Sequence, residues 1–310
     1  PGVTVNRYCA SGLETIAMAT AKIRTGLADC IIAGGTESMS LVPTAGWKTV
    51  PAYSIAKDDP DYYLSMGLTA EAVAKEYNVN RKDQDEFSYQ SHRKAIHAIE
   101  NGYFKSGILP INVEEVYLDE KGKKQKRNYV VDTDEGPRAD TSVEVLAKLK
   151  PAFAAGGMVT AGNSSQTSDG AAFVIVMGEK MMNELGLKPI ARLVACASAG
   201  VHPRIMGIGP VAAIPKALKQ VNMSLNDIDL IELNEAFASQ SLAVIREVGL
   251  DPAKVNINGG AIALGHPLGC TGCKLTIQIV NDMKRLNKKY GMVTACVGGG
   301  QGIAGVIENL

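Results

Sequence analysis

One arrangement of elements occurs twice in the sequence, and it constrains the fold more than any other feature. Each copy has a short loop of small residues, a stretch with helical apolar spacing, an apolar run typical of a strand, and a Gly-Gly pair. The copies span residues 9–35 and 270–299. Internal duplication of an α/β unit explains this most simply, so we predict two similar halves. If the halves pair about a pseudo-twofold axis, the loops that begin the two helices can face one another.

A glycine-rich stretch, residues 259–269 (GGAIALGHPLG), stands directly before the second copy. It contains His266, one of only four histidines in the chain. A lone histidine on a buried face is usually a core residue, but glycines lie on both sides of this one and no apolar face surrounds it. We therefore interpret His266 as a site residue on a tight loop that backbone and substrate can approach closely. The helix after it is predicted to start near Gly272.

The first copy begins at Cys9, at or just before a helix predicted from Ala10 to about Gly26. Free backbone N–H groups and the positive end of the helix dipole favour a thiolate there, with a pKa below the usual value of about 8.5. Free cysteine is also often a small buried hydrophobic residue. Position alone leaves both interpretations of Cys9 open.

Residues 41–155 differ from the rest of the chain in composition and pattern, with more charged residues, most of the tyrosines and little alternation typical of strands. We predict an inserted domain here, between an N-terminal half (1–40 and 156–187) and a C-terminal half (188–310). Its helices are expected over 68–77 and 81–101, the second capped by Asn80, and His92 and His97 are interpreted as surface residues of that helix. Strands are predicted near residues 3–6, 29–33 (ended by Gly34-Gly35), 171–177, 191–197 and 229–233. The polar loop 162–170 is either a turn or a grip for a polar ligand.

Composition excludes several classes of function. Basic and acidic residues balance at 32 each, which gives no general attraction to nucleic acid or anionic membranes. The basic run 121–127 is interpreted as a solvated hairpin tip, the alternative being a patch for an anionic ligand. Six scattered cysteines do not form a disulfide framework and suggest a reducing compartment; Cys270 and Cys273 lack partners at zinc-ligand spacing, so no metal site is expected. No run is apolar enough to span a membrane.

Five segments, in this order, resemble the thiolase family along the entire chain: 6–12 (NRYCASG), 161–165 (AGNSS), 234–238 (NEAFA), 259–269 (GGAIALGHPLG) and 296–300 (CVGGG). The insert is similar to the degradative branch, the 3-ketoacyl-CoA thiolases, at 66–71 (MGLTAE), 134–138 (DEGPR) and 146–153 (LAKLKPAF). The resemblance implies an α/β fold of two similar α/β/α halves, each with a mixed five-stranded sheet, plus an inserted loop domain. Family members begin well before the reactive cysteine. The first half is thus expected to be incomplete, with an exposed sheet edge and part of its core exposed, and any targeting peptide to be absent from view.

The resemblance also implies roles for individual residues. Cys9 is expected to be the acyl-accepting nucleophile and His266 to take its proton and help stabilise the thioester oxygen of the substrate. Cys296 is expected to act as general acid and base. Asn234 is expected to hold a water in one oxyanion hole, and the backbone N–H groups of Cys9 and Gly298 to form a second.

Substrate-binding residues follow from the same resemblance. Ser165 is expected to contact the pantetheine arm of coenzyme A, and Phe153, Met206 and Phe237 to line its tunnel. Met66, at the start of the motif in the insert, is expected to bind substrate as well. The biosynthetic branch often has histidine before the Met-Gly of this motif, whereas this chain has Ser65, which favours the degradative branch.

The implied reaction is the CoA-dependent thiolytic cleavage of 3-ketoacyl-CoA to acetyl-CoA and a shortened acyl-CoA, as in fatty acid β-oxidation. No metal or redox cofactor is expected, coenzyme A being a substrate. A homodimer or homotetramer in the cytoplasm is expected, with no nucleic-acid partner and no membrane insertion. The alternatives are condensation of two acetyl-CoA to acetoacetyl-CoA, a non-catalytic acyl-CoA binder if the half-sheet cannot hold Cys9, and a nucleic-acid partner bound through residues 121–127.

Overall fold

The computed structural model describes residues 1–44 and 46–310, and its largest sheet comes from the second half of the chain. Strands β5 (Ala191–Gly200), β6 (Leu230–Leu233), β7 (Tyr290–Val297) and β8 (Gln301–Asn309) lie in the order β5-β8-β7-β6. The β5/β8 and β7/β8 pairs are antiparallel and β6/β7 is parallel, so the sheet is mixed, as predicted. Almost every residue of β7 and β8 is buried, because helices cover both faces of the sheet.

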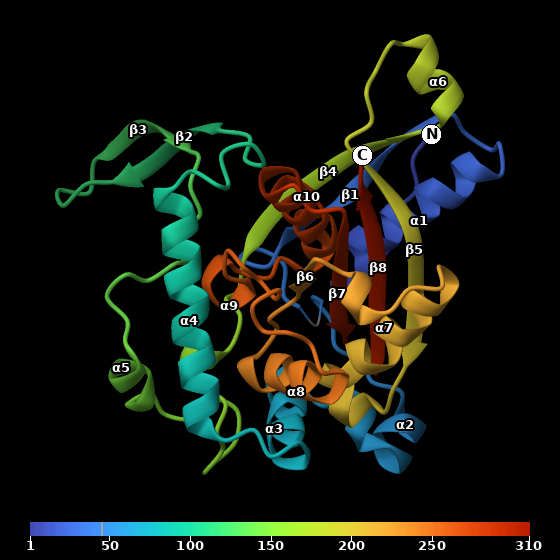
Figure 1. Ribbon diagram of the computed structural model, residues 1–310. Coiled ribbons are helices and arrows are strands. Elements are labelled where there is room, and N and C mark those ends of the chain that lie inside the picture. The colour runs from blue at the N-terminus through green and yellow to red at the C-terminus, as the bar shows by residue number, and fades with distance from the viewer. Residues whose placement is uncertain (45) are drawn as a thin grey trace.

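The two faces of this sheet carry different helices (Figure 1). On one face α7 (Gly209–Gln220) and α8 (Ala238–Val248) pack on alternate residues of the strands, with Ile214 and Val244 at the contact. On the other face lie α1 (Ser11–Arg24), from the first half of the chain, and α10 (Leu268–Leu286). Leu13 of α1 and Ile279 of α10 belong to this second core cluster. The two halves are therefore joined through shared core rather than merely linked in sequence.

The first half contributes a two-stranded antiparallel sheet, β1 (Cys30–Ser38) with β4 (Asp169–Met177). One face of it packs on the outer side of α1 and α10, which places α1 and α10 between two sheets. On the other face Ile32, Phe173 and Ile175 are more than half exposed. This face of the sheet therefore presents apolar side chains to solvent. The short helix α6 (Glu179–Glu184) follows β4.

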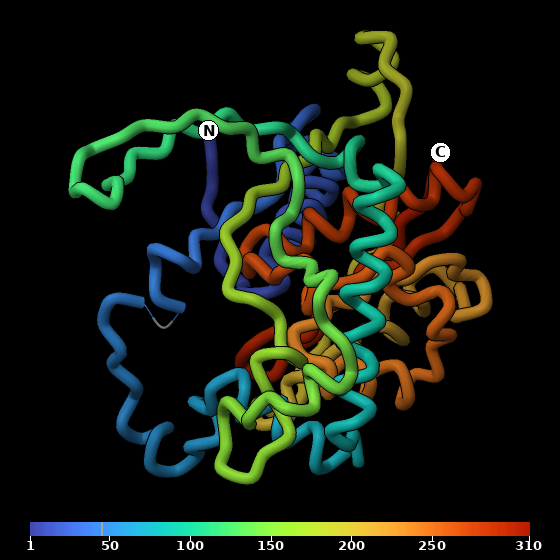
Figure 2. Tube along the Cα trace, turned by 90° about the vertical axis from the view of Figure 1, so that its left-hand side faces the viewer, coloured from blue at the N-terminus to red at the C-terminus, as the bar shows by residue number. Residues whose placement is uncertain are grey.

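The insert forms α2 (Tyr53–Asp58), the 3-10 turn η2 (Pro60–Tyr63), α3 (Met66–Glu76), α4 (Arg81–Glu100), the hairpin β2 (Ile111–Leu118) with β3 (Lys124–Val131), and α5 (Val143–Ala147). Helices α3 and α4 pack against α8, and α4 also against α9 (Ala261–Leu264). The hairpin projects from the body of the molecule (Figure 2). The predicted cap of α4 is confirmed, since Asn80 accepts a hydrogen bond from the backbone of Asp83 at 2.8 Å. Four further 3-10 turns are η1 (Tyr8–Ala10), η3 (Ala161–Asn163), η4 (Pro203–Ile208) and η5 (Leu225–Asp227).

Several expectations need correction. The larger sheet has four strands rather than five, because Val255 makes only an isolated parallel bridge to Ile231 beyond β6. Residues 3–6 are not a strand, and β1 continues through Gly34-Gly35, where pairing with β4 holds the glycines extended. Helix α10 begins at Leu268, ahead of the expected start, with Pro267 as its N-cap. The insert also contains strands.

His92 is a further correction, since it is buried and not a surface residue. Its Nδ1 accepts a hydrogen bond from the backbone N–H of Arg138 at 3.2 Å, because the segment around residue 138 lies against α4. His97 is exposed, as predicted. The hairpin interpretation of residues 121–127 is confirmed, and Lys126 and Arg127 pair across the hairpin with acidic side chains of β2.

Candidate active site

Two helix N-termini meet at the centre of the molecule. Helices α1 and α10 approach so closely that a Cβ atom on Gly12 would lie 2.5 Å from the backbone nitrogen of Cys273. A Cβ on Gly272 would overlap the backbone of Leu13 in the same way. Only glycine allows this contact. The contact brings η1, which carries Cys9, beside the loop that carries His266, so the predicted juxtaposition of the two loops is confirmed.

Cys9 and His266 are in direct contact. The sulfur of Cys9 lies 3.1 Å from Nε2 of His266, and the two residues are only 6% and 5% exposed. The other ring nitrogen, Nδ1, lies 2.7 Å from the hydroxyl of Thr271. The amide nitrogen of Asn234 lies 3.3 Å from Nε2. The structure therefore brings together three predicted site residues, and adds Thr271, which sequence reasoning missed.

The backbone before Cys9 is held in an uncommon conformation. Tyr8 has φ of 47°, a left-handed value that is unusual for a bulky residue and is found where surrounding contacts enforce it. The hydroxyl of Ser11 supplies such contacts by accepting from the backbone N–H of Arg7 at 2.8 Å and donating to the carbonyl of Tyr8 at 2.7 Å. Arg7 in turn pairs with Glu14 of α1. These contacts set the direction in which the Cys9 side chain leaves the turn.

Burial controls the charge state of the pair. It raises the pKa of the Cys9 thiol to about 11, although the backbone N–H groups of Gly298 and Cys9 point at the sulfur and lower the pKa in part. Burial also lowers the pKa of His266 to about 3, with a further contribution from the positive charge of Lys274. The two groups are thus a neutral thiol and a neutral imidazole at pH 7. The expectation that the helix N-terminus lowers the pKa of Cys9 below its usual value is wrong, because the desolvation of the sulfur outweighs the effect of the helix N-terminus.

Cys296 and Gly298 reach the same centre from the other direction. Cys296 is the penultimate residue of β7 and is fully buried; burial, followed by repulsion from the ionised form of the neighbouring Cys9, raises its pKa well above the ordinary value. Gly298 begins the turn to β8, and its N–H points at the Cys9 sulfur. The sulfur of Met66 lies 3.5 Å from the position of a Cβ on Gly298, so Met66 covers this turn.

The expected substrate-binding residues divide into an exposed and a buried group. Met66 and Phe153 are each more than one-third exposed, and the ring of Phe153 packs edge-to-face on Phe237 with centroids 6.0 Å apart. Phe237 and Met206 are buried in one cluster with Cys296. Ser165 is half-buried, and its backbone N–H donates to the carbonyl of Ala236, which ties the loop at 161–170 to the segment 234–238.

Glu235, next to Asn234, is a second residue whose importance was not predicted. Its buried carboxylate accepts hydrogen bonds from Ser91 of α4 at 2.6 Å, from Asn256 at 2.8 Å and from the backbone of Ile262 at 3.2 Å. It thereby connects the insert to the glycine-rich loop. In the sequence, only its position beside Asn234 points to a role for Glu235, because its three hydrogen-bond donors come from distant segments.

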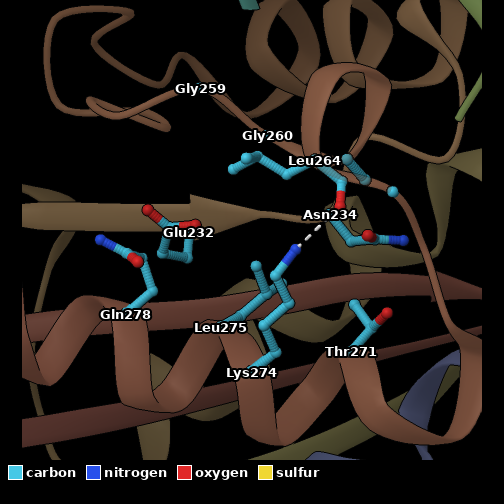
Figure 3. A pocket seen from close by; sticks show the side chains of 11 residues that line it. Glu232, Asn234, Gly259, Gly260, Leu264, Thr271, Lys274, Leu275 and Gln278 are labelled. Carbon is cyan, nitrogen blue, oxygen red and sulfur yellow. Dashed lines mark hydrogen bonds between the residues drawn. The ribbon is translucent and has the colours of Figure 1, made fainter. Parts of the chain in front are cut away.

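A small cavity of about 20 Å³ lies on the other side of Asn234 and Thr271. Figure 3 shows its lining residues, with the ammonium of Lys274 donating to the carbonyl of Leu264 at 3.2 Å. Glu232 also lines it, and burial raises the pKa of this carboxyl well above the ordinary value. The volume holds about one water molecule and no acyl chain. The cavity is therefore not the substrate tunnel.

Across residues 1–44 and 46–310, no cluster of three or more histidine, cysteine or acidic side chains is arranged to hold a metal ion. No helix in this described part of the chain is both long and apolar enough to cross a membrane.

Known proteins match the chain over nearly its whole length. The model of the thiolase N-terminal domain matches residues 1–180, and that of the thiolase C-terminal domain matches residues 187–309. A 3-ketoacyl-CoA thiolase of Bacillus subtilis is 54% identical, covering 99% of this chain and 79% of that protein. An acetyl-CoA acetyltransferase of Pseudomonas aeruginosa is 48% identical, covering 98% and 78%. The crystal structure of the dimeric peroxisomal thiolase of Saccharomyces cerevisiae is similar with a TM-score of 0.88 and 39% identity, covering 99% and 76%. Since the family models account for both halves, the chain belongs to the thiolase family of acyltransferases.

Proposed function

We propose that this protein catalyses the CoA-dependent thiolytic cleavage of 3-ketoacyl-CoA through an acyl-cysteine intermediate on Cys9. The observation that carries the proposal is the 3.1 Å contact between the Cys9 sulfur and Nε2 of His266, with the N–H groups of Cys9 and Gly298 pointing at the same sulfur. A nucleophile, a base and two oxyanion donors thus converge on one buried point.

In the first step, His266 takes the proton of Cys9 and the thiolate attacks the 3-keto carbon. The oxygen that becomes negative is stabilised by the N–H groups of Cys9 and Gly298. The Cα–Cβ bond then breaks, leaving the shortened acyl group on Cys9 and the enolate of acetyl-CoA. His266 and a water held by Asn234 stabilise the enolate oxygen, and Cys296 gives the proton that completes acetyl-CoA.

In the second step, the thiol of incoming coenzyme A returns a proton to Cys296. The resulting thiolate attacks the acyl-cysteine thioester, and Cys9 leaves as thiolate and recovers its proton from His266. The carbonyl groups of the substrate accept the electrons throughout, so the chemistry needs no metal or redox cofactor. Met66 and Phe153, exposed beside Gly298 and Phe237, are proposed to contact the substrate together with Ser165, Met206 and Phe237.

The test is the intact mass of the protein after incubation with a medium-chain 3-ketoacyl-CoA and no free coenzyme A. We expect a mass increase equal to the shortened acyl group. Cys9→Ala is expected to abolish it, and Cys30→Ala, which removes an exposed cysteine of β1, is the matched control and is expected to retain it. A folded protein that binds the substrate without any adduct would instead be a non-catalytic acyl-CoA binder.

The second candidate function is the condensation of two acetyl-CoA to acetoacetyl-CoA, favoured by the acetyl-CoA acetyltransferase name of the Pseudomonas aeruginosa relative. The higher identity to a protein named 3-ketoacyl-CoA thiolase, and Ser65 before Met66, favour cleavage of longer substrates. The ratio of kcat/KM for 3-ketooctanoyl-CoA to that for acetoacetyl-CoA separates the two. A ratio above one supports the first function, and turnover confined to acetoacetyl-CoA supports the second.

We also propose that the protein works as a homodimer or homotetramer in the cytoplasm. The exposed Ile32, Phe173 and Ile175 of the β1–β4 sheet support association, as does the dimeric state given for the Saccharomyces cerevisiae thiolase. Light scattering coupled to size exclusion tests the assembly, and cell fractionation tests the compartment. No nucleic-acid partner is proposed, because cross-strand acidic residues pair with Lys126 and Arg127 of the hairpin.

A further inference from the structure

The ring of His266 is linked to the helix behind it by a short chain of hydrogen bonds. Nδ1 lies 2.7 Å from Oγ1 of Thr271, and the Thr271 hydroxyl donates to the carbonyl of Pro267 at 2.9 Å. Both His266 and Thr271 are buried, Thr271 with 1% exposure. Helix α10 sets the geometry of these hydrogen bonds, because Pro267 and Thr271 are four residues apart across its first turn.

The donors and acceptors in this series of hydrogen bonds can be assigned. A carbonyl oxygen can only accept, so in its 2.9 Å contact with Pro267 the Thr271 hydroxyl is the donor, and its one proton is then not available to Nδ1. In that arrangement the hydroxyl oxygen faces Nδ1 with a lone pair, and Nδ1 supplies the proton of the 2.7 Å contact. A neutral imidazole has one N–H only, so Nε2 is left with a lone pair.

The other contacts of the ring agree with this assignment. Nε2 faces the thiol of Cys9 and the amide nitrogen of Asn234, and both of these groups can donate. Within the described residues, these two and Thr271 are the hydrogen-bonding partners of the ring. Asn234 has no other side-chain partner, since its Oδ1 is buried without one, so the orientation of its amide depends on the ring as well.

We propose that Thr271 is a positioning residue that holds His266 in the Nδ1–H tautomer, so that Nε2 is the base facing Cys9 and the amide nitrogen of Asn234 is turned toward the reacting atoms. The inference rests on the proposed function, in which Nε2 takes the proton of Cys9. It adds a residue that touches neither sulfur nor substrate but decides which nitrogen is available.

The chain offers a matched control for the variant. Thr276 is buried one turn further along α10, and its hydroxyl also donates to the carbonyl four residues before, Gly272, at 2.8 Å. Thr276→Val therefore removes the same type of helix contact and the same hydroxyl, but has no imidazole partner. Thr271→Val removes the acceptor of Nδ1–H with little change in volume, and Thr271→Ser keeps it.

The test is ¹⁵N NMR of protein labelled at histidine, where protonated and unprotonated ring nitrogens have distinct shifts. The chain has four histidines, and His266→Asn identifies the signal of interest. We expect a protonated Nδ1 and an unprotonated Nε2 in the wild type, Thr271→Ser and Thr276→Val. In Thr271→Val we expect the ratio of tautomers to shift toward Nε2–H, and the rate of Cys9 acylation to fall roughly 10-fold or more, since a buried unsatisfied N–H and a misplaced base both act against the reactive form.

An unprotonated Nδ1 in the wild type would overturn the proposal without any variant being needed. It would be overturned equally by Thr271→Val retaining both the tautomer and the acylation rate, or by Thr276→Val losing as much rate as Thr271→Val. The tautomer is read without turnover. If the NMR result holds and no acyl adduct forms, the proposed function fails and the positioning of the ring stands.

Discussion

The neutral state of Cys9 leads to a prediction about the pH dependence of its alkylation. With a pKa of about 11, the thiolate fraction at pH 8 is about 0.1%, compared with roughly a quarter for a thiol with the usual pKa of about 8.5. The thiolate is the reactive form. The rate of alkylation by iodoacetamide should therefore rise about tenfold per pH unit from pH 6 to pH 10, without a plateau.

The assay is peptide mass spectrometry of protein treated at a series of pH values, with exposed Cys30 in the same digest as an internal reference. The slight exposure of Cys9 slows reagent access by a factor that does not change with pH. For this reason the shape of the profile carries the result, and the absolute rate does not. A thiolate–imidazolium pair in the resting protein would instead give a plateau between the two pKa values. A plateau beginning below pH 8 would refute the argument that desolvation outweighs the helix N-terminus and the two N–H donors.

Three further predictions concern stability. Gly12→Ala forces a methyl group onto the backbone of Cys273 and should lower the free energy of unfolding by about 1–3 kcal/mol; an unchanged urea midpoint would show that α1 and α10 can separate at no cost. Glu235→Ala leaves three buried donors without an acceptor and should cost about 3 kcal/mol or more, so a variant with wild-type thermal stability would contradict its linking role. Burial raises the pKa values of Cys270 and Cys273 to about 11 and about 12. The contribution of these two thiols to the free energy of unfolding is complete below their unfolded-state pKa. It is lost as the pH rises toward their folded-state pKa values, because the unfolded chain releases these protons first. The urea midpoint should thus fall above about pH 9, and a midpoint that stays constant to pH 10.5 would exclude this contribution.

Local signals in the sequence account for much of what was predicted correctly. Helix α4 was recognised from its periodicity and from Asn80, whose capping contact spans three residues. The repeated unit, with glycines at Gly12 and Gly272, indicated two equivalent helix starts. Such features depend on residues that are close in the sequence, so they can be predicted without knowledge of the fold. The resemblance of five motifs to the thiolase family then supplied the expected roles of individual residues.

The errors have a different origin. His92 is expected on the surface from its helix alone, but it is buried in the fold, where the segment at Arg138 lies against it. Residues 29–33 were expected to end at Gly34-Gly35, yet pairing with β4 extends the strand through the glycines. In both cases the deciding partner lies far along the chain. Local propensity is weaker than such tertiary contacts.

Residue types and local patterns indicate which side chains are available for chemistry and that two helices begin beside Cys9 and near His266. The protonation state in which these side chains meet depends on the fold. Burial, which sums contacts from both halves, makes Cys9 a neutral thiol instead of a thiolate. The rotation of the His266 ring and the position of Thr271 in the first turn of α10 decide which nitrogen carries the proton. These properties depend on distances of about 3 Å between residues distant in sequence, and only packing determines such distances.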